Sequence, residues 1–239
     1  MESRCDSAPD QLLLERGSEV SLTTIVSYDG TRNDADALTL ARVLGEAGAH
    51  LVLTYVRHHA DARDEDEASA LLERGATALG DADVETRVVI NASTSRGLRE
   101  LAQALDAQLI VFGSEYRTPT GRVAPQQSTQ QLLDGGPTAI AIAPAGYSQR
   151  PIMTIGLLAG LDDEAAIDTA HALANQFGAT VTDSNHGVDL VIMGSRPEAQ
   201  PGHILLSAQA ENAITETRAP VLVVARGAAV EFQPQIYIA

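Results

Sequence analysis

Two apolar segments of this sequence end in the same dipeptide, Gly-Ser, and this repeat constrains the fold more than any other feature. The segments are Gln108–Ser114 and Asp189–Ser195, and each has a further glycine, Gly121 or Gly202, eight residues after its first. Each copy then continues through a helix-like segment into another apolar strand, at 139–143 and at 221–224. A fixed order of elements that occurs twice predicts two copies of one structural unit.

The residues around the first Gly-Ser alternate between strand and helix patterns. Short apolar runs predict strands at 22–28, 50–56, 84–90, 109–114 and 139–143, and amphipathic spacing predicts helices at 34–48, 63–80, 93–105 and 128–133. Strands that alternate with helices are joined by right-handed crossovers, which predicts an α/β fold with a doubly wound, mostly parallel sheet. Ligands of such sheets bind at the carboxyl ends of the strands, near the point where strand order reverses.

The second copy is shorter than the first. After a linker at 146–151, the pattern restarts with a strand at 153–159, a helix at 162–177 and an extended segment at 179–182. Only Asp183 to Val188 then precede the second Gly-Ser strand, whereas a parallel crossover takes about a dozen residues or more. The helix–strand–helix that occupies 63–105 in the first copy is therefore missing. We divide the chain into an N-terminal extension (1–20), a complete unit (21–147), a truncated unit (151–228) and a C-terminal tail (229–239).

The composition excludes several classes of protein. The formal net charge is −16 and the chain has no lysine, which disfavours binding to the phosphate backbone of nucleic acids. The single cysteine, Cys5, cannot form an intramolecular disulfide. The sequence shows no signal-peptide pattern, and no apolar run approaches the roughly 18 residues of a membrane span. We therefore expect a cytoplasmic protein with no nucleic-acid or membrane partner.

Five segments, taken together, resemble the universal stress proteins, and one of them, Leu51–Val56, resembles the second strand of that family. Ile25–Thr31 resembles the opening strand and acidic turn of that family, and Leu109–Ser114 resembles the strand before its ligand loop. Pro137–Pro144 and Pro220–Val224 are both similar to the family's final strand. The resemblance implies a five-stranded parallel sheet of the adenine-nucleotide alpha hydrolase type and a regulatory role in the stress response. It also implies that final strands from two domains pair, which the two copies could do within one chain.

The phosphate-binding motif of the family is degenerate in this sequence. Members that bind ATP carry Gly-x2-Gly-x9-Gly-Ser/Thr after the fourth strand, where glycines let backbone N–H groups approach phosphate oxygens. Gly113 matches the first position, but Tyr116 replaces the second glycine, and Gln126 and Gln127 replace the last pair. ATP or another adenine nucleotide is therefore a candidate ligand of the first copy only because other positions of the family's ligand site are matched in this sequence.

Those remaining positions define the candidate ligand site. Asp29 and Val56 match positions that contact ribose or adenine in nucleotide-binding members, and the hydroxyls of Ser128 and Thr129 lie just beyond the motif. The candidate contacts are thus Asp29, Val56, Gly113, Ser114, Ser128 and Thr129. Two of these features also have a purely structural interpretation, because Asp-Gly is ordinary turn chemistry and Gly-Ser can simply end a strand.

Three functions remain open from the sequence. The first is a regulatory protein that binds a small ligand or nucleotide in its first copy, and the second is a scaffold that has lost ligand binding. The third, a slow ATPase, has no catalytic motif to support it, and we expect no enzyme. The sequence lacks a Gly-x-Ser-x-Gly elbow, and we expect the polar group of His58, His59, Asp61 and Asp64 to lie at the surface and bind no metal. An exposed sheet face in the truncated copy favours a homodimer.

Overall fold

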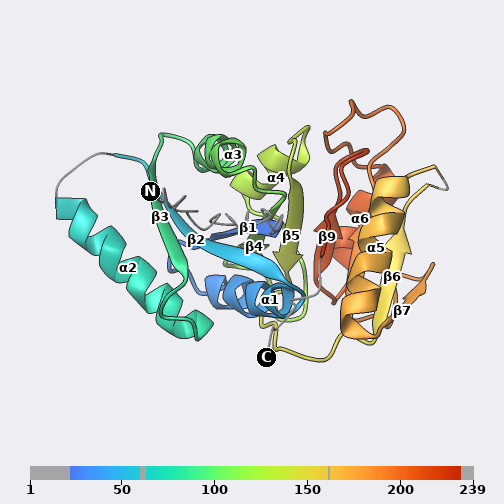
Figure 1. Cartoon of the computed structure of the whole chain (residues 1–239), viewed down its shortest axis with the longest axis horizontal. Helices are drawn as coiled ribbons and strands as arrows, with labels where there is room; N and C mark the ends of the chain where they lie inside the picture. Colours follow the sequence, from blue (N-terminus) through green and yellow to red (C-terminus); the bar gives the residue numbers. More distant parts are fainter. Residues whose placement is uncertain (1–21, 60–62, 161, 233–239) are drawn as a thin grey trace, which may run out of the picture.

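A single β-sheet runs through the computed structural model, which describes residues 22–59, 63–160 and 162–232 (Figure 1). The first unit contains β1 (Leu22–Ser27), α1 (Asp34–Glu46), β2 (Ala49–Arg57), α2 (Arg63–Leu79), β3 (Glu85–Ile90), α3 (Thr94–Leu105), β4 (Leu109–Gly113), α4 (Gln127–Leu133) and β5 (Ala139–Ala143). The second unit contains β6 (Thr154–Leu158), α5 (Glu164–Phe177), β7 (Thr180–Thr182), β8 (Leu190–Met193), α6 (Ala208–Glu216) and β9 (Val221–Val223). The predicted N-terminal extension, Cys5 and Asp61 lie outside the described residues.

The strand order confirms the predicted fold class. The nine strands follow the order β3-β2-β1-β4-β5-β9-β8-β6-β7, and every pair within a unit is parallel. The two units meet at β5 and β9, which pair antiparallel with Ile140 opposite Val223 and Ile142 opposite Val221. The pairing of final strands that the resemblance implied is therefore made inside this chain. In the first unit the order reverses between β1 and β4, which is where ligands bind doubly wound sheets.

Different helices cover the two faces of the sheet. Helices α1, α2 and α5 pack on one face, and α3, α4 and α6 pack on the other (Figure 1). The central strands β4, β5, β8 and β9 are buried along their whole length. Because both faces of these strands are covered, their sequences are continuous apolar runs without the alternation of a half-exposed strand. Within the three described ranges, no helix combines the length and the hydropathy that crossing a bilayer requires.

A short loop replaces the crossover that the second unit lacks. Residues 183–189 connect β7 to β8 without a helix. A Cβ built on Gly156 of β6 would lie 2.3 Å from the carbonyl oxygen of Ser184 and 3.2 Å from Val188 Cγ2. The loop therefore lies directly on β6, and only a glycine there permits this approach. It covers part of the sheet face that the sequence analysis expected to be exposed.

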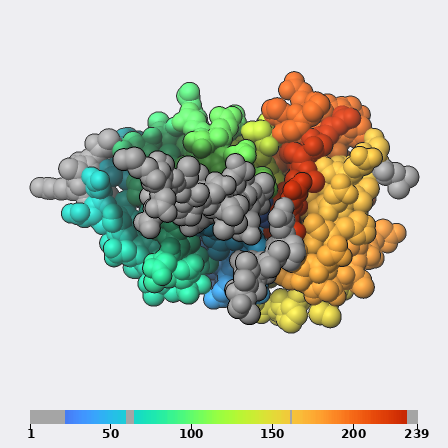
Figure 2. Space-filling model, in the orientation of Figure 1, coloured from blue at the N-terminus to red at the C-terminus, as the bar shows by residue number. Residues whose placement is uncertain are grey.

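Contacts beyond the β5–β9 pair join the two units, which lie side by side in Figure 2. Arg122 of the first unit donates from Nη1 to the carbonyl oxygen of Glu216, at 3.2 Å, at the end of α6. The Ile204 N–H donates to the carbonyl oxygen of Gly136, at 2.9 Å. In the predicted C-terminal tail, Phe232 is buried against the core of the α5 face, so the packed structure extends at least to this residue.

Candidate functional site

A cavity of about 260 Å³ lies at the carboxyl ends of β1, β2 and β4, beside the point where strand order reverses. Its lining comprises Ser27, Tyr28, Asp29, Thr31, Asp34, Tyr55, Val56, His58, Thr94, Phe112, Gly113, Gln126 and Ser128. Four of the six predicted contacts, Asp29, Val56, Gly113 and Ser128, are therefore brought together. The other two, Ser114 and Thr129, are fully buried and are not part of the lining.

Gly113 is required by the packing of the first unit. A Cβ at this residue would lie 2.2 Å from the carbonyl oxygen of Asn33, the residue just before α1. Asn33 is held in place because its Nδ2 donates to the carbonyl oxygen of Glu115, at 2.7 Å. The start of α1 therefore lies directly against the end of β4, and the absence of a side chain at Gly113 is what permits this contact.

Ser114 ties the loop after β4 to the neighbouring strand. Its Oγ donates to the carbonyl oxygen of Ala143, at 2.7 Å, and accepts from the Ala124 N–H, at 3.2 Å. The second unit repeats this arrangement. Ser195 Oγ donates to the carbonyl oxygen of Val224, at 2.8 Å, and accepts from the Leu205 N–H, at 3.4 Å. The Gly-Ser repeat therefore encodes the same structural bond in both units.

Several backbone donors of the loop between β4 and α4 bond to acceptors of the same loop. N–H groups donate from Glu115 to Ala124 O, from Arg117 to Glu115 Oε2, from Thr118 to Glu115 O and from Arg122 to Pro119 O, whereas the Gly121 N–H donates to Ala145 O, beyond β5. The phosphate cradle of ATP-binding members depends on such N–H groups being free to face the ligand. The corresponding loop of the second unit makes matching bonds, such as Arg196 N–H to Leu205 O and Gly202 N–H to Arg226 O.

The three residues that replace the motif positions have different environments. Tyr116 is 53% exposed, with the Arg117 guanidinium carbon 4.9 Å from its ring centroid, and it does not line the cavity. Gln126 does line the cavity, just before α4, whereas Gln127 begins α4 and is exposed. The tyrosine therefore leaves the cavity open, and one glutamine forms part of its wall.

A pair of carboxyl groups forms the most polar part of the cavity. Asp34 is 3% exposed, and its Oδ2 accepts from the Asp29 N–H at 2.6 Å and from the Thr31 N–H at 3.2 Å. Asp29 accepts a second bond from the Thr31 N–H through Oδ1, at 3.0 Å. Burial, followed by the hydrogen bond and the negative charge of Asp29, raises the pKa of Asp34 to about 7. The sequence analysis named Asp29 but missed Asp34; a second acid at the start of the following helix was the available signal.

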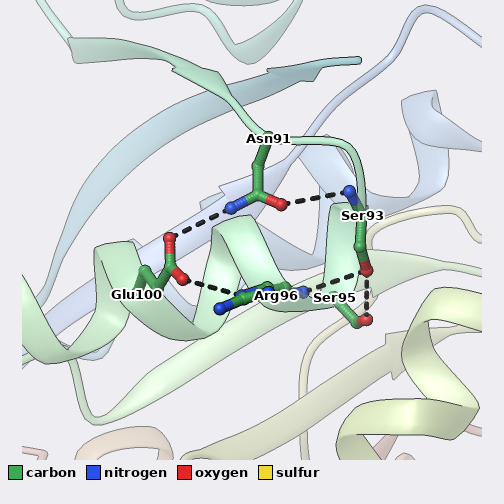
Figure 3. Close-up of polar contacts among 5 residues, drawn as sticks. All are labelled: Asn91, Ser93, Ser95, Arg96 and Glu100. Atoms are coloured by element: carbon green, nitrogen blue, oxygen red, sulfur yellow. Dashed lines mark hydrogen bonds and ion pairs between the residues drawn. The ribbon is translucent and has the colours of Figure 1, made fainter.

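The first turn of α3 contributes one residue, Thr94, to the lining of the cavity. The helix is capped by Ser93, whose Oγ accepts from the Arg96 N–H at 3.4 Å (Figure 3). Asn91 Oδ1 accepts from the Ser93 N–H, and Asn91 Nδ2 donates to Glu100 Oε2, at 3.0 Å. Arg96 pairs with the other oxygen of Glu100, also at 3.0 Å. This network holds the end of α3 that contributes Thr94 to the cavity.

At the corresponding end of β8, the described residues of the second unit form a smaller cavity beside Asp163. Asp163, which caps α5, is 8% exposed, and a Cβ on Gly194 would lie 1.9 Å from its Oδ2. The carboxyl side chain thus fills space beside the end of β8, and burial raises its pKa. The adjoining cavity has a volume of about 130 Å³. Within the described ranges, no group of three or more histidine, cysteine, aspartate or glutamate residues is arranged to hold a metal ion.

Comparison with known proteins identifies the fold. No protein-family model and no curated protein sequence matches the chain. A universal stress protein from Archaeoglobus fulgidus DSM 4304 covers 87% of this chain with 100% of its own length, at a TM-score of 0.66 and 12% identity. A protein of Pseudomonas aeruginosa PAO1 described as functionally unknown covers 87% with 94% of its length, at a TM-score of 0.59 and 16% identity.

These similarities define the class of protein as an α/β protein with the universal stress protein fold. The predicted resemblance is confirmed at the level of the fold. The particular form is a chain in which one complete unit and one shortened unit share a single sheet through β5 and β9.

Proposed function

We propose that this chain is a regulatory protein of the universal stress type that binds a small ligand in the cavity of its first unit. The observation that carries this proposal is the convergence of Asp29, Val56, Gly113 and Ser128 on one cavity at the sheet's switch point. The second unit extends the sheet beside β5, and the cavity beside its Asp163 has about half the volume of the cavity in the first unit. In this proposal the first unit binds the ligand and the second unit supports the sheet. We expect no hydrolysis of ATP.

The ligand that this cavity favours carries few or no phosphate groups. Both acids of the lining would repel phosphate, and no arginine belongs to the described lining. Of the loop N–H groups near the phosphate-binding positions, those of Glu115, Arg117 and Thr118 donate to acceptors of the same loop. The volume of 260 Å³ also lies below the ~300–1,000 Å³ typical of clefts that bury drug-sized ligands.

A series of adenine compounds tests this proposal. We expect adenosine to bind more tightly than AMP, and AMP more tightly than ATP, because each phosphate adds charge repulsion near Asp29 and Asp34. Calorimetric titration at constant ionic strength measures the three affinities. Val56→Trp should abolish binding by filling the cavity, whereas Met153→Trp, at a residue 59% exposed in the second unit, should leave it unchanged. Tighter binding of ATP would refute the ligand class, and no binding of any small ligand would favour the scaffold function.

The homodimer is a second proposal, and the structure suggests a different surface for it. Strand β3 is at one edge of the sheet and exposes Val88 and Ile90, at 39% and 56%. Unpaired edges with apolar side chains are prone to pair with another chain. We expect light scattering to give twice the chain mass of 25.1 kDa, and Ile90→Lys to reduce it to a single chain. Met153→Lys is the control, and a monomeric mass for the unmodified protein would contradict the proposal.

A further inference from the structure

The acid pair of the cavity has no cationic partner within the described part of the chain. Asp34 is 3% exposed, and its hydrogen-bond donors are the N–H groups of Asp29 and Thr31. No described arginine or histidine forms an ion pair with Asp29 or Asp34, and the lining includes no arginine. A buried carboxyl without a countercharge is costly to ionise, and a cation entering the cavity would remove that cost.

Three aromatic residues belong to the lining of the same cavity, Tyr28 and Tyr55 from the α1–α2 face of the sheet and Phe112 from the α3–α4 face. Tyr28 precedes Asp29, Tyr55 lies near the end of β2, and Phe112 lies near the end of β4. Aromatic faces attract ammonium groups through their negative π-systems, and they also pack against alkyl chains. Carboxylates beside aromatic rings, in a cavity lined by no arginine, match the chemistry of an alkylammonium ion. An inorganic cation is a poorer match, because Ca²⁺ needs roughly six to eight oxygen ligands.

Resting on the proposed small-ligand function, we propose that the cavity of the first unit is a site for a small organic amine. Its ammonium group binds beside the carboxyl groups of Asp29 and Asp34, and its alkyl part packs against Tyr28 and Tyr55. The hydroxyls of Thr31 and Ser128 and the side-chain amide of Gln126 also line the cavity and are available to polar groups of such a ligand.

Binding of an amine at this site should release a proton. Asp34 has a pKa of about 7, so it is largely protonated at pH 6, and a bound ammonium group favours its ionised form. Release of one proton makes binding about tenfold tighter at pH 8 than at pH 6. The other groups facing the pair are Tyr28 at the end of β1, Tyr55 and His58 at the end of β2, and Arg74 of α2, which acts on Tyr28.

Titration calorimetry with putrescine, a short alkyl diamine, tests the proposal on the full chain. We expect saturable binding with one site per chain in physiological salt, and no binding of the diol of the same chain length. Asp34→Asn should weaken putrescine binding at pH 8 by about tenfold or more and remove the pH dependence. Asp168→Asn removes the same charge from an exposed position on α5 and should change neither.

The outcomes separate this inference from the function on which it rests. Equal binding of the diol, an unaffected Asp34→Asn variant, or binding to many weak sites would overturn the amine site. If adenosine binds and putrescine does not, the small-ligand function stands and the amine is wrong. If neither adenosine nor putrescine binds to the unmodified protein, both proposals fail.

Discussion

Gly113→Ala is expected to destabilise the protein by about 3 kcal/mol, which for a chain of this size lowers the melting temperature by on the order of 6–12 °C. The new methyl group would lie 2.2 Å from the carbonyl oxygen of Asn33. This neighbour is backbone, so relief requires moving the start of α1 away from β4 or bending β4. Thermal unfolding followed by circular dichroism measures the change.

Gly45→Ala is the matched control for this substitution. Gly45 lies inside α1, and its new Cβ would meet only Leu51, with the nearest atom at 3.5 Å, which is an ordinary contact. Alanine is the better helix former, so this variant should gain about 0.5–1 kcal/mol. If Gly113→Ala unfolds at the same temperature as the unmodified protein, the close approach of Asn33 to β4 is wrong.

Asp34→Asn is expected to stabilise the protein at pH 8 by up to about 4 kcal/mol and to have little effect near pH 4. The pKa of Asp34 is about 7 in the folded protein, above its ordinary value of 3.8. The folded state therefore holds a proton that the unfolded state releases. The contribution of Asp34 to stability is therefore greatest below pH 4, falls as the pH rises to about 7, and is constant above that. Asparagine keeps the acceptor for the Asp29 and Thr31 N–H groups and avoids the buried charge.

Urea unfolding at pH 4, 6 and 8 measures this pH dependence. Burial also raises the pKa of Asp36 and of Asp163, so the unmodified protein should lose stability in the same direction from these residues. The variant should therefore flatten the pH profile only in part. Asp168→Asn controls for the change in net charge, and an Asp34→Asn variant that is less stable than the unmodified protein at pH 8 would contradict the prediction.

Local patterns were sufficient for most of the fold. The segment predicted as a strand at 139–143 is β5, and the helix predicted at 63–80 is α2, because apolar spacing and turn residues act locally. The shortened second unit was also predictable, because a chain too short for a crossover cannot contain one. The site was less predictable. Asn33 bonds to Glu115, which is distant in sequence, and the pKa of Asp34 is raised mainly by burial. Neither effect can be read from the spacing of residues along the chain.

The role of the Gly-Ser repeat was also not predictable from the sequence alone. Its position at a strand end was readable, but whether Ser114 faces a ligand or a carbonyl oxygen depends on where β5 lies. The structure places Ala143 within hydrogen-bond distance, and the same bond in the second unit joins Ser195 to Val224. A repeat that is kept for the fold thus resembles, in sequence, a repeat that is kept for binding.

The antiparallel β5–β9 pair joins two strands of different sequence, so the two sides of this junction need not match each other. In a symmetric homodimer joined by identical strands, a residue and its symmetry copy occupy equivalent places, so any substitution acts on both sides at once. Here Ile140 lies opposite Val223 and Ile142 opposite Val221, and each position can vary independently. One unit can therefore lack a crossover that the other contains. Joining both units in one chain thus allows the two halves of the sheet to differ in sequence and in length.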